Sequence, residues 1–302
     1  MSYSPLRRSL LAALAAAPFA SVRAQPAAAM SRALAAQEQL AKLEASSGGR
    51  LGVAARNTAD GAVVEYRASE RFPMCSTFKL LAVGAILKRS MDEHALLDER
   101  VRFGAGDLVA YSPVAEKHVD RGMTIGELCV AALQYSDNTA ANLLLTALGG
   151  PEVVNEFARS IGDTWFDLVR WETELNASVP GDLRDTTTPQ AMMRDVERLL
   201  LGDVLAVPQR EMLRGWMEGN RTGGARIRSA VSRFSSSSSS GWVVADKTGS
   251  GDYGTANDVG VVFLPAAAVV IAVYFTGVMP RETTPRSEVV AGAAEIVLRT
   301  LV

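Results

Sequence analysis

The sequence predicts an α/β protein of the α+β type: an antiparallel sheet built from both ends of the chain and flanked by helices, with an all-α part inserted between them. Three observations predict it. Strand patterns occur near the N-terminus, and they return only near the C-terminus. The patterns between Ser76 and Glu218 are almost all helical. We expect the functional site in the cleft between the sheet and the inserted part.

The expected elements follow one another with start and stop signals at sensible places. The first are a helix over residues 31–46, which ends at Ser-Ser-Gly-Gly, and a hairpin with strands over 50–57 and 63–68. Four helical patterns then cover 123–134, 138–149, 151–162 and 188–202, three strands cover 242–249, 257–264 and 268–275, and a last helix begins near Arg286. The predicted α/β part is therefore 25–74 with 219–302, and the predicted all-α part is 75–218. The six serines from Ser235 to Ser240 supply no side-chain core, so we expect a mobile loop there.

The composition is that of a soluble globular enzyme, because 48% of the 302 residues are hydrophobic and 21% are charged. The formal net charge of -2, with both signs spread along the chain, provides no basic stripe, so we expect no nucleic-acid partner. Cys75 and Cys129 are the only cysteines, and neither lies in a His or Cys cluster. A bridge between them stays open, but two buried free thiols are favoured. We expect a monomer without a metal or another cofactor.

The first 24 residues have the pattern of a cleaved export signal. Arg7 and Arg8 precede an apolar run from Leu10 to Phe19, and small residues lead to a cleavage site after Ala24. The arginine pair fits both the twin-arginine route and ordinary signals. No later run reaches the roughly 20 apolar residues of a membrane span. We therefore expect a periplasmic or secreted protein that has no membrane attachment in its mature form.

Ser76 and Lys79 open a helix that is otherwise apolar on nearly every side. Leu80, Leu81 and Val83 follow, so the lysine should be buried. The i, i+3 spacing places the serine and the lysine on one face within hydrogen-bond reach. Burial disfavours charged lysine, so Lys79 could accept a proton from Ser76, and the positive end of the helix would favour the serine alkoxide. The pair alone is a weak signal, since it recurs by chance about once in a chain of this size.

Two further motifs carry polar groups. Ser136 and Asn138 lie between two predicted helices, where hydroxyl and amide side chains most often serve as helix caps. Lys247, Thr248 and Gly249 end a predicted strand, where the glycine would let the backbone approach a ligand. A turn at the strand end explains the glycine equally well, but it does not explain the Lys-Thr pair.

In this order the three motifs resemble those of the serine penicillin-recognising enzymes. A fourth, Glu172 to Asn176 in the pattern Glu-x-x-Leu-Asn, is similar to the omega loop of class A β-lactamases. A glutamate and an asparagine that hold one water supply a base for hydrolysing an acyl-enzyme, which transpeptidases lack. The resemblance covers nearly all of the chain after the signal. It implies hydrolysis of the β-lactam ring of penicillins and cephalosporins, a cyclic amide, and hence resistance to these antibiotics.

The resemblance also implies a role for each matching residue. The catalytic set is Ser76 as nucleophile, Lys79 and Glu172 as bases, Ser136 as proton donor to the lactam nitrogen and Lys247 as its electrostatic partner. The substrate-binding set is Tyr111, Asn138, Asn176, Arg226, Thr248 and Ser250. In it, Asn138 faces the substrate side-chain amide, Thr248 and Ser250 receive the substrate carboxylate, and Tyr111 walls the mouth of the cleft. The backbone N–H groups of Ser76 and Ser250 resemble an oxyanion hole.

Some charged positions match the family pattern only in part. Ala256 lies where many members have an arginine, and Arg226 matches the position from which some members supply that charge. A plain surface arginine is the alternative for Arg226. Arg170 and Asp185 match the ion pair that closes the neck of the omega loop.

The two cysteines match positions that form disulfides in some members of the family. The position that would pair with Cys129 holds Val83, and the one that would pair with Cys75 holds Gly251. The resemblance therefore implies that neither bridge forms.

Two other functions remain open on the sequence. A cell-wall D-Ala-D-Ala carboxypeptidase or transpeptidase would keep a long-lived adduct with penicillin, and a β-lactam sensor module would bind in the same pocket without deacylation. The motif from Glu172 to Asn176 favours turnover instead. Sensors usually come with transmembrane segments, and no such run follows the signal.

Overall fold

Five antiparallel strands in the order β2-β1-β9-β8-β7 form the main sheet of the computed structural model, which describes residues 27–234 and 241–302. They are β1 (Arg50–Asn57), β2 (Val63–Tyr66), β7 (Val243–Ser250), β8 (Ala256–Phe263) and β9 (Ala268–Thr276). β1 pairs with β9 along its whole length, from Arg50 opposite Thr276 to Asn57 opposite Val269. The predicted sheet of segments from both ends is therefore confirmed. The export signal predicted over 1–24 and the serine tract lie outside the described residues.

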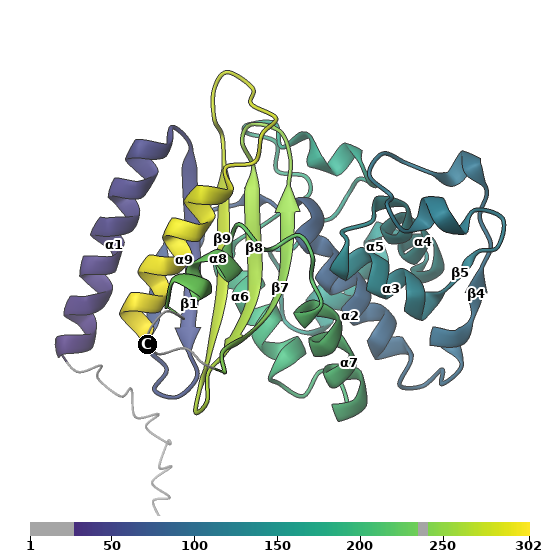
Figure 1. Cartoon of the computed structure of the whole chain (residues 1–302), viewed down its shortest axis with the longest axis horizontal. Helices are drawn as coiled ribbons and strands as arrows, with labels where there is room; N and C mark the ends of the chain where they lie inside the picture. Colours follow the sequence, from purple (N-terminus) through teal and green to yellow (C-terminus); the bar gives the residue numbers. More distant parts are fainter. Residues whose placement is uncertain (1–26, 235–240) are drawn as a thin grey trace, which may run out of the picture.

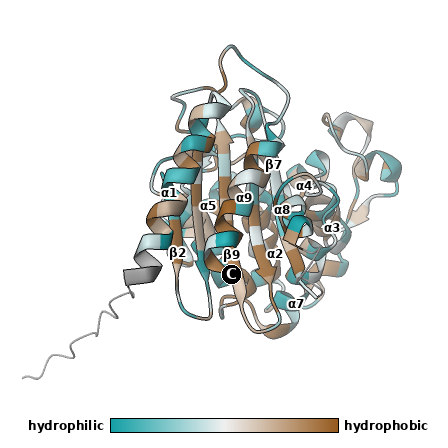
Figure 2. Cartoon of the chain, turned by 60° about the vertical axis from the view of Figure 1, so that its left-hand side comes forward, coloured by the Kyte–Doolittle hydropathy of each residue, from teal (hydrophilic) through white to brown (hydrophobic). Residues whose placement is uncertain are grey.

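The central strand β9 is buried at every residue, and its side chains alternate between two hydrophobic cores. Val269 and Ile271 point into one core, whereas Val270 and Ala272 point into the core on the opposite face. A strand covered on both faces needs no polar positions, which explains its continuous apolar sequence. Figure 2 shows the strands of the sheet as largely hydrophobic, whereas α1 carries both hydrophilic and hydrophobic residues.

Three helices cover one face of the sheet (Figure 1): α1 (Ala27–Ser47), α8 (Ile227–Phe234) and α9 (Ser287–Leu301). The helices at 31–46 and from Arg286 are thus confirmed within a few residues. Helix α8 was not predicted. Its signal was Ile227, Ala230 and Val231 at i, i+3 and i+4, which are the buried positions of this short helix.

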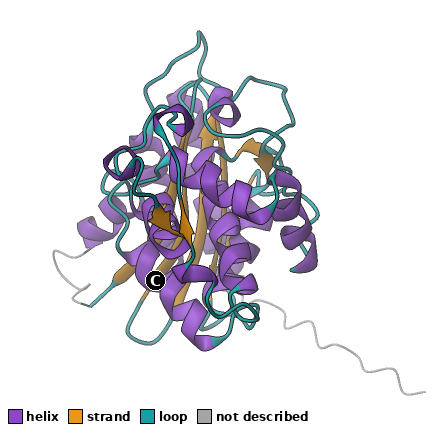
Figure 3. Cartoon of the chain, turned by 90° about the vertical axis from the view of Figure 1, so that its right-hand side faces the viewer, coloured by secondary structure: helices purple, strands orange, loops and turns teal. Residues whose placement is uncertain are grey.

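The other face carries α6 (Pro189–Leu200), which packs on β1, β8 and β9 although its residues fall in the segment predicted to be all-α. Beyond it lie α2 (Lys79–Arg89), α3 (Ile125–Gln134), α4 (Asn138–Leu148), α5 (Pro151–Ser160) and α7 (Val207–Glu218). Every residue of α2 from Lys79 to Leu87 is buried, so this helix is the axis of the helical part. When the molecule is viewed from the side of these helices, they lie in front of the strands of the sheet (Figure 3). None of the helices within 27–234 and 241–302 is both long and apolar enough to cross a membrane.

Short strands and 3-10 turns lie in the segments between these longer elements. β3 (Phe72–Pro73) pairs with β6 (Thr186–Thr187), and β4 (Arg100–Val101) pairs with β5 (Met123–Thr124). The 3-10 turns are η1 (Cys75–Phe78), η2 (Leu96–Asp98), η3 (Ala105–Asp107), η4 (Ala115–His118) and η5 (Glu174–Ala177). The β3–β6 pair matters most for the site, because it holds the chain just before η1 against the chain that leaves the loop of η5.

Two aspartates are buried next to each other, Asp195 on α6 and Asp163 in the turn after α5. Asp195 is 0% exposed and Asp163 is 3% exposed. One oxygen of Asp163 accepts hydrogen bonds from the backbone N–H groups of Trp165 and Phe166, but its other oxygen and both oxygens of Asp195 have no hydrogen-bond partner among the described residues. Burial and the neighbouring Asp163 raise the pKa of Asp195 well above its usual range, although Arg198 lies 3.8 Å away.

We predict that this carboxyl makes the protein less stable as the pH rises. Below the ordinary Asp pKa of about 3.9, Asp195 is protonated in both folded and unfolded chains. At higher pH the unfolded chain loses this proton first, so the free energy of unfolding falls until the folded state also loses it. Asp195→Asn should remove more than about 1 kcal/mol of that decrease between pH 4 and pH 8. Urea unfolding across this range checks it, with the exposed Asp203→Asn as control; coinciding pH profiles for parent and Asp195→Asn would contradict it.

Candidate active site

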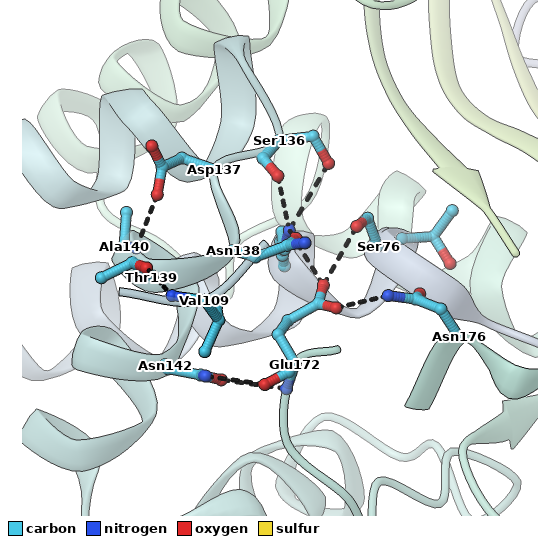
Figure 4. Close-up of polar contacts among 12 residues, drawn as sticks. Ser76, Val109, Ser136, Asp137, Asn138, Thr139, Ala140, Asn142, Glu172 and Asn176 are labelled. Atoms are coloured by element: carbon cyan, nitrogen blue, oxygen red, sulfur yellow. Dashed lines mark hydrogen bonds and ion pairs between the residues drawn. The ribbon is translucent and has the colours of Figure 1, made fainter. Parts of the chain in front are cut away.

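Ser76 lies in η1, which leads directly into the buried helix α2. The preceding residue, Cys75, has a φ of 45°, a left-handed conformation that is strained for a non-glycine residue and is found most often at functional sites. Ser76 Oγ donates a hydrogen bond of 3.1 Å to Glu172 Oε1. The nucleophile candidate therefore faces the glutamate of the predicted omega loop (Figure 4).

Ser76 and Lys79, which the i, i+3 spacing predicts to be within hydrogen-bond reach, make no hydrogen bond to each other among the described residues. Lys79 Nζ instead lies 2.8 Å from Ser136 O, 2.7 Å from Asn138 Oδ1 and 2.9 Å from Glu172 Oε1. An ammonium has three donors, and these three acceptors occupy them in full. Helical spacing brings Lys79 close to Ser76 but says nothing about acceptors from other loops, so proton transfer from Ser76 to Lys79 stays a prediction.

Lys79 and Glu172 form a buried ion pair in which both side chains are 0% exposed. Burial lowers the pKa of Lys79, while the Glu172 carboxylate opposes that shift. The net direction is downward, so Lys79 gives up its proton more readily than an exposed lysine. Glu172 Oε1 contacts both Ser76 Oγ and Lys79 Nζ, so one carboxylate oxygen can exchange protons with either group.

Ser136 is held by the second buried lysine. It has a φ of 57°, again in the left-handed region. Lys247 Nζ donates to Ser136 Oγ at 3.0 Å and to Thr248 O at 2.7 Å. Burial and repulsion by Lys79 lower the pKa of Lys247 well below its usual range. Lys247, which comes from β7, thus lies against the loop between α3 and α4.

The helix-cap interpretation of Ser136 and Asn138 is wrong, because Asp137 caps α4. Its carboxylate accepts from the backbone N–H of Ala140, and its other oxygen accepts from the N–H groups of Val114 and Ala115. Asn138 instead accepts from Lys79 and donates to Ala110 O at 2.9 Å. The cap leaves the side chains on either side of it free for the site.

Strand β7 forms the opposite wall. Gly249 is required there because a Cβ would lie 2.7 Å from Met74 O, next to η1. The glycine therefore lets the strand approach the turn that carries the nucleophile, rather than a ligand alone. Thr248 Oγ1 lies 2.5 Å from Thr222 Oγ1, and Ser250 Oγ accepts from Arg226 Nη2 at 2.6 Å.

These side chains surround a cavity of about 480 Å³. Tyr111, which is 61% exposed, lies at its mouth. The lining residues are Ser76, Tyr111, Ser136, Asn138, Asn176, Arg221, Thr222, Arg226, Thr248 and Ser250. The structure thus brings together every residue of the two predicted sets, with Lys79, Glu172 and Lys247 buried directly behind the lining.

Comparisons with known proteins agree with this geometry. The model of the "Beta-lactamase enzyme family" matches residues 35–301. The curated relative "Beta-lactamase Toho-1" of Escherichia coli is 49% identical over 303 residues, covering 98% of this chain and 99% of that protein. The chain belongs to the class A β-lactamase family. It is a hydrolase that opens the β-lactam amide, an activity that gives antibiotic resistance.

Other relatives of this β-lactamase also match over most of their length. The "Carbapenem-hydrolyzing beta-lactamase KPC" of Klebsiella oxytoca is 48% identical over 265 residues, covering 87% of this chain and 88% of that protein. The crystal structure of a β-lactamase from Burkholderia phymatum is 63% identical and has a TM-score of 0.86, covering 90% of this chain and 100% of that one. The α/β fold of the β-lactamase is therefore shown by its solved relatives as well as by its own sheet.

The omega loop of the β-lactamase is anchored by a residue that sequence reasoning missed. Asn142 of α4 donates to Glu172 O at 2.9 Å and accepts from the Glu172 N–H at 3.0 Å. The sequence feature that could have indicated Asn142 is its position one helical turn after Asn138 in a largely apolar helix, which places both asparagines on one face. Asn176 Nδ2 donates to Glu172 Oε2 at 2.5 Å, while Asn176 Oδ1 is buried without a partner in the described part of the chain.

The two thiols of the β-lactamase are both free and buried, as predicted. Cys75 Sγ lies 3.4 Å from Ser178 Oγ, and burial raises the pKa of Cys75 to about 12. A Cβ at Gly251 would lie 2.8 Å from Cys75 Sγ, so the glycine leaves room for the thiol. An undissociated thiol is a weak nucleophile, so Cys75 fills space behind Ser76.

Arg226 is not a surface residue. It is 5% exposed, and its guanidinium donates to Gly249 O at 2.7 Å, to Asn257 O at 2.6 Å and to Ser250 Oγ. The alternative of a plain surface arginine is therefore wrong. Its donors are engaged by β7 and β8, which fixes the Ser250 hydroxyl at the edge of the cavity.

Proposed function

We propose that this β-lactamase acts through an acyl-enzyme on Ser76, with penicillins and cephalosporins as substrates. The observation that carries the proposal is the contact of Glu172 Oε1 with both Ser76 Oγ and Lys79 Nζ. In acylation, the Ser76 proton passes to Glu172 or to Lys79 after it has lost its own proton, while Ser76 Oγ bonds to the lactam carbonyl carbon. The backbone N–H groups of Ser76 and Ser250 stabilise the negative oxygen that develops.

Ser136 then delivers a proton to the lactam nitrogen as the ring C–N bond breaks. It regains a proton from Lys79, whose Nζ lies 3.5 Å from Ser136 Oγ and which carries the proton taken from Ser76, directly or from Glu172. The Lys247 ammonium, 3.0 Å from Ser136 Oγ, favours this transfer because it stabilises the serine oxygen while the proton leaves. Deacylation needs a base for water, and Glu172 is that base. The unpartnered Asn176 Oδ1 supports the proposal, since it could accept a hydrogen bond from the same water.

The substrate groups have separate partners in the proposal. Thr248 and Ser250 receive the ring carboxylate, Asn138 binds the side-chain amide with its remaining amide N–H, and Tyr111 covers the ligand at the cavity mouth. The chain acts as a monomer in the periplasm or outside the cell, exported by the signal over 1–24, and the cleft lies between the α/β part and the all-α part.

The kinetics of a chromogenic cephalosporin test the proposal against its rivals. Steady hydrolysis with many turnovers per enzyme supports the acyl-enzyme with an efficient second step. A burst of one equivalent followed by a stop would instead indicate a carboxypeptidase-like or sensor-like protein.

Arg226 should act on substrate binding through Ser250. We predict that Arg226→Ala raises KM for penicillins roughly tenfold, in line with the loss of one charge-assisted hydrogen bond, and lowers kcat less. Steady-state kinetics measure the change in KM and the change in kcat separately. The control for net charge is Arg32→Ala, because Arg32 is an exposed arginine on α1. Unchanged kinetics in a folded Arg226→Ala enzyme would show that Ser250 does not depend on this arginine.

A further inference from the structure

Two arginines line the active-site cavity, and they differ in what they contact. The guanidinium of Arg226 is engaged by backbone carbonyls and Ser250. Arg221 is exposed, and its side chain makes no hydrogen bond or ion pair within the described residues. No acidic residue lines the cavity among the residues that the structure describes. Arg221 is therefore a cation at the rim whose charge is not neutralised by its surroundings.

The backbone under Arg221 is held firmly. Its N–H donates to Gln134 O at 2.8 Å, and the next residue, Thr222, donates to Asn220 Oδ1 from both its backbone N–H and its hydroxyl at 2.8 Å. Asn220 Nδ2 in turn donates to the buried Asp246 at 2.9 Å. Because the backbone is already fixed, only the side-chain rotamers of Arg221 have to be ordered when its guanidinium contacts an anion.

The neighbours of Arg221 place it near the expected position of the ring carboxylate of the substrate. The Thr222 hydroxyl contacts the Thr248 hydroxyl, and Thr248 is where the proposed function puts the ring carboxylate. The proposed function puts the side-chain amide of the substrate at Asn138, at the start of α4, and not at Thr248 on β7. In a cephalosporin the ring substituent next to the carboxylate would therefore extend toward Arg221.

We propose that Arg221 selects for β-lactams that carry a second negative charge on the ring substituent next to the carboxylate. This inference rests on the proposed placement of the ring carboxylate at Thr248 and Ser250. A negative substituent gains attraction from Arg221, a neutral one gains none, and a positive one is repelled.

Three cephalosporins that share one aminothiazole-methoxyimino side chain provide the test: ceftriaxone has an acidic ring substituent, cefotaxime a neutral one and cefepime a cationic one. In Arg221→Gln, kcat/KM should fall about three- to fivefold for ceftriaxone, stay within about twofold for cefotaxime, and stay level or rise for cefepime. Arg221→Lys should keep most of the preference, and added salt should weaken it in the parent but not in Arg221→Gln. For a substrate that turns over slowly, its inhibition constant against a chromogenic penicillin replaces kcat/KM.

Arg32→Gln is the matched control, because it removes one exposed charge from α1 on the far side of the sheet (Figure 1). Equal changes for all three substrates, no change for any, or the same pattern in Arg32→Gln would each overturn the role of Arg221. A parent enzyme that hydrolyses neither penicillin nor cephalosporin would contradict the proposed function instead, so the two failures are distinguishable.

Discussion

Glu172→Ala is expected to accumulate a covalent acyl-enzyme on Ser76 when the protein is mixed with penicillin. Acylation should slow, because Glu172 Oε1 accepts the Ser76 hydroxyl, but Lys79 remains as a second base. Deacylation has no such substitute, so its rate should fall by about 10² to 10⁴. Mass spectrometry of the intact protein, taken seconds to hours after mixing, should show the mass of the added penicillin persisting.

Glu174→Ala is the matched control for this experiment, since Glu174 is an exposed glutamate two residues away on the same loop. It should turn over penicillin like the parent and show no lasting adduct. Continued turnover by Glu172→Ala without an adduct would remove Glu172 from its role as the hydrolytic base. A Glu172→Ala protein that neither turns over nor forms an adduct would place the base in acylation alone.

Asp185→Ala is expected to be the most destabilising single change at the site. Asp185 is 0% exposed, and its carboxylate accepts the backbone N–H groups of Val169 at 2.7 Å and Arg170 at 2.9 Å together with Arg170 Nε at 2.5 Å. Alanine would leave the two backbone N–H groups without this acceptor, and it would leave the Arg170 guanidinium with only its longer contact to Asp182, at 3.4 Å. Breaking one side of a buried pair in this way costs about 3–5 kcal/mol.

Urea unfolding measures this loss, and hydrolysis measured below the unfolding range shows whether the loop still holds Glu172. Asp182→Ala is the comparison, because Asp182 contacts Arg170 at 3.4 Å and the exposed Arg184 at 2.8 Å but accepts no hydrogen bond from the backbone N–H groups of Val169 or Arg170; it should contribute about 1 kcal/mol or less. A stability loss for Asp185→Ala no larger than that of Asp182→Ala would mean that the neck of the omega loop does not depend on this ion pair.

Much of the fold could be predicted because its signals are local. The apolar runs of β8 and β9, the capping signals of α3 and α6 and the turn between β1 and β2 are each contained in a few consecutive residues. Helix α8 was missed because it is short and its apolar positions are few. The packing of α6 on the sheet was also beyond local patterns, since a helix with one apolar face fits a sheet and a bundle equally well.

The candidate site shows the same division. Its residue types and their order in the chain were sufficient to indicate Ser76, Lys79, Ser136, Glu172 and Lys247, because each lies in a short motif. The contacts among them were not predictable. Lys79 forms hydrogen bonds and an ion pair with groups from two separate loops. Residue preferences at helix ends favoured Ser136 and Asn138 as helix caps, but the residue between them, Asp137, caps α4.

By itself the sequence determined which groups could do the chemistry, because a motif specifies residue types and spacing along the chain. Only the tertiary structure decided the state of those groups. The buried ion pair of Lys79 with Glu172, the engagement of Arg226 by backbone carbonyls and the free charge of Arg221 all depend on burial and on partners distant in the sequence. The physical reason is that desolvation and the choice of hydrogen-bond partners are set by the packing of several chain segments at once.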